Sequence, residues 1–247
     1  KADILSYGMG ERSMVALAEA FRDGTDWHGI RGICYARKAT PEGGTRSPDE
    51  VWLPSFAEVS SNDEAGRRAF LKAHRLFAAN QEPVTAKTLI QPTDMRELVH
   101  NPPALPLEAA ELDAVQGIPW MLDAPPAIRQ EGPIRALDTI RFAVTTHRGC
   151  YGNCRFCAIT VHQGRRVVSR SADSIVAEVA RFAKHPRFRG VVSDVGGPTA
   201  NMYGFDCPRK KSHGACSDKD CLFPHTCPAL KPDHGPQLAL LKRLREL

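Results

Sequence analysis

The chain has 247 residues, of which 42% are hydrophobic and 25% are charged, so it is long enough for one large domain or two smaller ones. No run approaches the roughly 18 apolar residues that a membrane-spanning helix needs, and the first residues lack the pattern of a signal peptide. These features argue against a helical membrane protein and a secreted one, and we expect a cytoplasmic location. The formal net charge of +5 is scattered along the sequence, which permits an anionic partner without indicating one.

The first part of the chain predicts alternating strands and helices. Residues 2–8 have the composition of a buried strand, and residues 13–24 have helical spacing that ends at Gly24. A second strand is expected within residues 28–38. Because a domain rarely begins on a central strand and this chain starts with a lysine, we expect it to be part of a longer protein.

Residues 39–137 are expected to form an irregular, proline-rich connecting region. Three elements are expected inside it: a strand at residues 50–54, a helix at residues 63–80 that ends at Asn80, and a strand at residues 86–91. Repeated prolines from residue 91 onward prevent long regular elements. This last stretch therefore predicts a linker with one short helix near residues 107–115.

The remaining part, residues 138–247, predicts a strand, a helix and a second strand in that order. The strands are expected at residues 139–146 and 188–197, and the helix follows a cap at Ser171 or Asp173. This order is typical of a parallel βαβ unit, whose ligand sites lie beyond the C-terminal ends of the strands. The three-cysteine loop and the Gly196–Gly197 pair are therefore expected at the same edge.

Eight cysteines fall into two groups and one single residue. Cys34 stands alone and is expected to be a small core residue. The two groups are Cys150, Cys154 and Cys157, and then Cys207, Cys216, Cys221 and Cys227. Such clustering in a chain without secretion signals favours metal binding over disulfides.

The first group has the spacing C-x3-C-x2-C. Zinc is one interpretation, with His147 or His162 as a fourth ligand. Three thiolates on one tight loop also suit three irons of a 4Fe-4S cluster, which leaves the fourth iron without a protein ligand. A metal with a vacant position can bind and activate a small molecule.

The loop "HRGCYGNCRFCAIT" after a first strand resembles the signature loop of radical S-adenosylmethionine enzymes. The resemblance implies that Cys150, Cys154 and Cys157 hold a 4Fe-4S cluster whose open iron binds S-adenosylmethionine. Reductive cleavage of that cosubstrate then gives a 5′-deoxyadenosyl radical. Phe156 is expected near the adenine, and Gly196 and Gly197 near the methionyl group. Pro198 stands where the family's motif commonly has Glu, which leaves its contact open.

Longer matches, including "NPPALPL", "HRGCYGNCRFCAITVHQGR", "GGPTANMYGF" and "DHGPQLALLKRLR", resemble the YgiQ-type family of radical SAM proteins. This implies the end of a Rossmann-like N-terminal domain in residues 1–38. It also implies the N-terminal part of a (βα)6 radical SAM barrel in residues 138–247, with a cysteine-rich insertion at residues 201–234. An electron donor such as flavodoxin or ferredoxin is implied as a partner. Since the later barrel strands are missing, we expect this piece alone to be inactive, and its substrate is unknown.

The second cysteine group, Cys207, Cys216, Cys221 and Cys227, can close a zinc site or hold an auxiliary iron–sulfur cluster. Reduced thiols without metal are the alternative. For the whole chain, the alternative function is a zinc-stapled binding module without radical chemistry. RNA is one ligand considered for that module. The basic residues around the first loop can be interpreted as a docking surface for RNA or another polyanion: His147, Arg148, Arg155, residues 162–166 and Arg170. The same residues could instead neutralise the cluster and the cosubstrate carboxylate, or face solvent.

Overall fold

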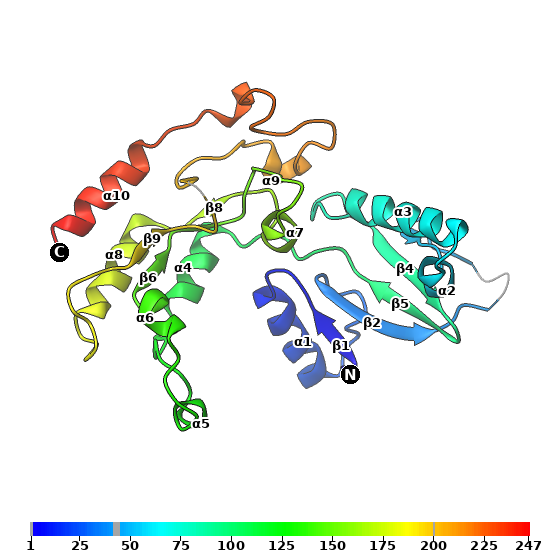
Figure 1. Ribbon diagram of the computed structural model, residues 1–247, viewed down its shortest axis with the longest axis horizontal. Helices are drawn as coiled ribbons and strands as arrows, with labels where there is room; N and C mark the ends of the chain where they lie inside the picture. Colours follow the sequence, from blue (N-terminus) through cyan, green and yellow to red (C-terminus); the bar gives the residue numbers. More distant parts are fainter. Residues whose placement is uncertain (1, 42–44, 200) are drawn as a thin grey trace. The chain divides into compact units, whose positions relative to one another are not determined.

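The computed structural model describes residues 2–41, 45–199 and 201–247 (Figure 1). The chain divides into two compact units, which are described separately. The first unit contains the residues up to Pro106, together with Cys154–Arg165 and Arg209–Lys219. The second unit contains Leu107–Asn153, Arg166–Pro208 and Asp220–Leu247. Among the described residues, no helix is long and apolar enough to cross a membrane.

A five-stranded sheet is the centre of the first unit. Its strand order is β1 (Ile4–Ser6), β2 (Ile33–Lys38), β5 (Arg96–His100), β4 (Thr88–Thr93) and β3 (Glu50–Trp52). Neighbouring strands are antiparallel, except that β3 and β4 are parallel. The helices of this unit are α1 (Glu11–Asp23), α2 (Phe56–Ser60), α3 (Glu64–Ala79), α7 (Ile159–Gln163) and α9 (Lys210–His213). The predicted α/β class is confirmed.

Helices α1 and α3 cover opposite faces of this sheet. Val99 of β5 belongs to a core cluster with Leu17 of α1. The next residue, His100, has its ring centroid 5.4 Å from that of Phe77 in α3. Because successive residues of a strand point to opposite faces, each helix packs on its own side of the sheet.

The helix ends follow local sequence signals. Gly24 ends α1 with a left-handed φ of 65°, and its N–H donates to the carbonyl of Ala20, as is typical of glycine at this position. At the start of α3, the Asp63 carboxylate accepts a hydrogen bond from the N–H of Gly66. Asn80 ends α3. The predicted ends at Gly24 and Asn80 are therefore confirmed.

The first strand differs from its prediction, because β1 lies at the edge of the sheet and Leu5 is 59% exposed. The Rossmann-like arrangement expected for residues 1–38 requires parallel strands on either side of the helix, but β1 and β2 are antiparallel. The cause is the connection after α1, which returns the chain to the end of β1. There the N–H of Tyr7 donates to the carbonyl of Gly32 over 2.9 Å. The pairing of β1 with β2 thus differs from a parallel arrangement, and the assignment of residues 1–38 to the end of a Rossmann-like domain stays a prediction.

The prediction of a linker from residue 91 is wrong at its start, because β5 is a central strand with a buried Val99. Proline counts as a strand breaker, yet Pro92 lies within β4. The pairing of β4 with β3 ends at Ile90, so the missing N–H of Pro92 leaves no partner unsatisfied on that side. The boundaries of the expected domains stay a prediction.

The second unit is built on a βαβ unit. Strands β6 (Ala143–Thr145) and β9 (Asp194–Gly196) are parallel, and α8 (Ala172–Phe182) lies between them in sequence. A second small sheet pairs β7 (His147–Arg148) with β8 (Val168–Ser169). The other helices are α4 (Ala109–Gly117), α5 (Pro126–Arg129), α6 (Ala136–Ile140), the 3-10 helix η1 (Pro228–Leu230) and α10 (Gly235–Arg245). The predicted parallel βαβ unit and the short helix near residues 107–115 are confirmed.

The core of the second unit lies between α8, β6 and α10. Val144 of β6 packs with Ile175, Val179 and Phe182 of α8 and with Leu240 of α10. Ser171 caps α8 by accepting a hydrogen bond from the N–H of Ser174, as predicted.

The first strand of the βαβ unit is shorter than residues 139–146, because the chain up to Ile140 forms α6. There the N–H of Arg141 donates to the carbonyl of Leu137. The described residues contain no closed barrel.

Candidate functional site

The C-terminal edge of β6 and β9 brings the glycine pair next to the segment that leads into the cysteine loop. Thr145 pairs with Gly196, and beyond the strands the N–H of Thr146 donates to the carbonyl of Gly196 over 2.7 Å. Both chain segments leave the sheet here, so the predicted common edge is present. Gly196, Gly197 and Pro198 are half-buried, and Ala200 lies outside the described residues.

Gly197 contacts the imidazole of His147 so closely that no side chain fits. A Cβ at position 197 would lie 2.2 Å from both Cε1 and Nε2 of His147. The ring is 1% exposed, and its Nδ1 lies 2.9 Å from Oγ1 of Thr146. The glycine is therefore required by packing, and it holds the backbone of this edge against His147.

Gly149 determines how the chain approaches Cys150. Its φ is +86°, and a Cβ there would lie 1.9 Å from the carbonyl oxygen of Arg166. Only glycine combines this left-handed conformation with such a close approach to backbone. Cys150 follows, 5% exposed, and its Sγ accepts hydrogen bonds from the N–H of Gly152 at 3.3 Å and from Oγ1 of Thr199 at 3.6 Å.

Arg170 joins this edge to α8. Its guanidinium donates to the carbonyl of Thr145 at 3.0 Å, to Oε2 of Glu178 at 2.5 Å and to Oγ of Ser174 at 2.8 Å. The Arg170 side chain is fully buried, so it cannot take part in the basic RNA-binding surface expected from the sequence. His147, which is also buried, is excluded from that surface for the same reason.

The other two cysteines of the first group belong to the first unit and differ in exposure. Cys154 is exposed and Cys157 is half-buried, and the N–H of Cys157 donates to the carbonyl of Cys154. Phe156 between them is 93% exposed. This turn leads into α7, and neither the exposed thiol nor the exposed ring adds to the core.

The segment after Cys157 packs against part of the cysteine-rich insertion within the first unit. Arg165 donates from its guanidinium to the carbonyls of Cys216 and Lys219, and its own carbonyl accepts from Nζ of the buried Lys210. Nη1 of Arg209 lies 3.0 Å from Sγ of Cys216. These contacts place Cys216 beside residues 154–165.

The rest of the second cysteine group belongs to the second unit. The N–H of Cys227 donates to the carbonyl of Cys221 over 2.8 Å. The N–H of Cys207 donates to Oδ1 of Asp206, whose Oδ2 accepts from the N–H of Val167. Burial, with a smaller contribution from Asp206, raises the pKa of the nearby Tyr151, so its phenol stays neutral.

The donor atoms fit a thiolate-bound cluster. All eight cysteines are free thiols, which are the ligands that iron–sulfur clusters use. Within residues 2–41, 45–199 and 201–247, no three His, Cys, Asp or Glu side chains form a group that could hold a metal ion. The ligand sets at both cysteine groups therefore stay predictions that rest on spacing and donor chemistry.

Several contact residues were not predicted. Thr199, Asp206 and Glu178 reach the site by contacts between segments far apart in the sequence. Only Thr199 had a local signal, because it lies directly after the glycine-rich stretch.

Comparison with known proteins identifies the family. Residues 1–143 match the family model described as "Radical SAM N-terminal". The whole chain is 46% identical to a UPF0313 protein of Fusobacterium nucleatum, 41% identical to one of Methanosarcina acetivorans and 38% identical to one of Clostridium botulinum. These alignments cover 42%, 36% and 37% of the relatives, respectively, so the chain spans well under half of their length. Because the radical SAM N-terminal model matches more than half of the chain, the chain belongs to the radical SAM superfamily, and it is similar to the UPF0313 proteins.

Proposed function

We propose that this chain is the cluster-binding part of a radical SAM enzyme. In this proposal Cys150, Cys154 and Cys157 hold a 4Fe-4S cluster, and residues 138–247 form the start of a (βα)6 barrel. The observation that carries the proposal is the hydrogen bond from Thr146 to Gly196 at the edge of β6 and β9. It brings the glycine-rich strand end beside the segment that leads into Cys150, at the edge where parallel sheets bind ligands.

When bound, a reduced cluster with one open iron supplies the electron that cleaves S-adenosylmethionine into methionine and a 5′-deoxyadenosyl radical. The residues of this chain would position Cys150 and its sulfur for cluster binding. Gly149 directs the backbone into Cys150, and Thr199 and the N–H of Gly152 donate to the Cys150 sulfur. Such donors stabilise a thiolate.

Three further residues would seat the cosubstrate. Gly197 has no side chain, since a Cβ there would overlap His147, so its backbone at the C-terminal edge of β9 would be open to the cosubstrate. Pro198 has no N–H to donate but keeps its carbonyl, which can accept a hydrogen bond from an ammonium group. The exposed ring of Phe156 offers a flat apolar face against which an adenine can stack.

Anaerobic reconstitution with iron and sulfide tests the proposal on the 247-residue chain. We expect a brown protein that dithionite bleaches, with an EPR signal that changes when S-adenosylmethionine is added. Cys154→Ala should lose this iron. Cys34→Ala is the matched control, because Cys34 lies on β2 outside both groups, and it should keep the iron. A colourless wild-type protein that contains stoichiometric zinc and no iron would instead support the zinc-stapled module.

The second cysteine group is proposed to hold zinc or an auxiliary cluster. A variant with Cys207, Cys216, Cys221 and Cys227 all changed to serine should lose that metal and keep the iron of the first loop. Equal metal content in this variant and the wild type would contradict the second site.

The catalytic activity, its substrate and an electron donor such as flavodoxin or ferredoxin are proposals for the whole protein. Formation of 5′-deoxyadenosine by a full-length relative would test the chemistry without knowledge of the substrate.

A further inference from the structure

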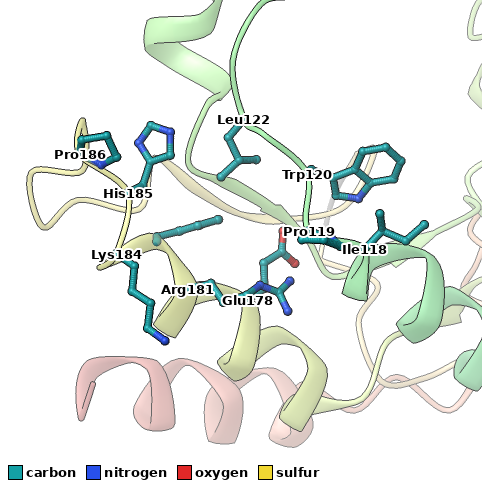
Figure 2. A pocket seen from close by; sticks show the side chains of 10 residues that line it. Ile118, Pro119, Trp120, Leu122, Glu178, Arg181, Lys184, His185 and Pro186 are labelled. Carbon is teal, nitrogen blue, oxygen red and sulfur yellow. The ribbon is translucent and has the colours of Figure 1, made fainter.

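A half-open pocket of about 240 Å3 lies at the C-terminal end of α8 in the second unit. Figure 2 shows its two sides. Ile118, Pro119 and Trp120 line one side, and the turn with Lys184, His185 and Pro186 lines the other. Arg181 and Glu178 of α8 lie between these two sides.

The turn that lines one side of the pocket lies near the N-terminal edge of the β6–β9 sheet. Before β9 begins, the N–H of Ser193 donates to the carbonyl of Phe142, which directly precedes β6. The Phe142 ring is 5.3 Å from that of His185, so the turn of the pocket belongs to this N-terminal edge.

The walls of the pocket are largely apolar. Phe182 is 2% exposed and closes the pocket against the core. At the mouth, Ile118 is 46% exposed and Trp120 is 57% exposed. Trp120 therefore leaves much of a large aromatic surface uncovered, beside a cavity that can take another flat group.

The rim of the pocket is positive. Arg181 and Lys184 are exposed cations, while the one acid of the lining, Glu178, is neutralised by Arg170 at 2.5 Å. The C-terminus of α8 contributes a partial charge of only about −0.5. Its last carbonyls also accept hydrogen bonds from the N–H groups of Lys184 and His185. An anion at the rim therefore meets a net positive charge.

We propose that this pocket binds a small amphipathic anion, with a flat apolar body against Trp120 and one acidic group near Arg181 and Lys184. Ligand pockets commonly combine apolar walls with a few polar groups that fix orientation. The cavity volume suits a ligand of one or two rings. This inference is independent of the proposed radical chemistry, since Trp120, Arg181 and Lys184 have no part in the proposed cluster or cosubstrate site.

A matched pair of fluorescent probes tests the proposal on the whole chain. 8-Anilinonaphthalene-1-sulfonate carries an anion, and N-phenyl-1-naphthylamine has the same aromatic body without it. We expect saturable binding of the sulfonate at one site, about fivefold tighter than binding of the neutral probe, given 0.2–1 kcal/mol for each exposed charge pair.

Three variants locate the probe. Arg181→Gln with Lys184→Gln should weaken binding of the sulfonate about fivefold and leave the neutral probe unchanged. Trp120→Ala should weaken binding of both probes. Lys242→Gln, which removes a cation from α10, should change neither. Equal binding of both probes, or equal effects of the rim and α10 variants, would overturn the proposal.

Discussion

Gly149→Ala should destabilise the second unit by more than the cost of a left-handed residue. The φ of Gly149 is +86°, and an added Cβ would lie 1.9 Å from the carbonyl oxygen of Arg166. A left-handed conformation costs an alanine about 1–2 kcal/mol. The overlap adds about 1–3 kcal/mol, as overpacking does, and it cannot be relieved by a change of rotamer because the neighbour is backbone.

Gly190→Ala is the matched control in the same unit. Gly190 has a φ of +79°, and no heavy atom lies within 4 Å of the position that an added methyl group would take. Both substitutions reduce the conformational entropy of the unfolded chain to the same extent. The difference between the two variants therefore isolates the overlap, and we expect Gly149→Ala to lose about 1–3 kcal/mol more than Gly190→Ala.

Urea unfolding followed by circular dichroism measures this difference. Because the chain has two units and need not unfold in one step, hydrogen exchange of peptides over β7 and β8 should show where protection is lost. If the two variants have equal unfolding free energies and equal exchange over β7 and β8, the argument from close approach is refuted.

Three further predictions concern the same unit. Gly197→Ala should lose about 1–3 kcal/mol, because the methyl overlaps the buried imidazole beside it; unchanged urea unfolding would contradict this. Arg170→Ala should lose about 3–5 kcal/mol, because the buried Glu178 carboxylate loses its ion-pair partner, and thermal unfolding should show part of this loss recovered when Glu178 is changed to leucine in the same chain. The hydrogen bond from Arg141 lowers the pKa of Asp123 in the folded state. The ionised Asp123 carboxylate therefore stabilises the fold above about pH 4, and this stabilisation is lost as the pH falls through the lowered pKa. Asp123→Asn should flatten this acid limb of the stability profile, and an unchanged limb would argue against the pair.

Sequence reasoning worked best where the signal is local. The ends of α1 at Gly24 and of α3 at Asn80, and the start of α8 at Ser171, follow from capping chemistry within one turn of helix. The order of strand, helix and strand around α8 also sufficed to predict parallel pairing.

The sequence did not predict which strands pair when the strands are far apart along the chain. The antiparallel pairing of β1 with β2 depends on the path of the chain between α1 and Gly32, which no periodicity encodes. The central strand β5 was hidden because Pro92 and the prolines after His100 lie on either side of it. From the sequence, Arg170 is grouped with several basic residues expected at the surface. In the structure it is buried and donates hydrogen bonds to Thr145 of β6 and Glu178 of α8.

The glycines and the cysteines of the site call for different explanations. Packing alone accounts for Gly149 and Gly197, since a Cβ at either would overlap Arg166 or His147; glycine there follows from the fold, with or without a ligand. Packing does not account for Cys154, whose thiol is exposed, or for Phe156, which is 93% exposed. In the proposed function, Cys154 would bind the cluster and Phe156 would contact the cosubstrate, and these roles would account for both residues without any contribution to the core.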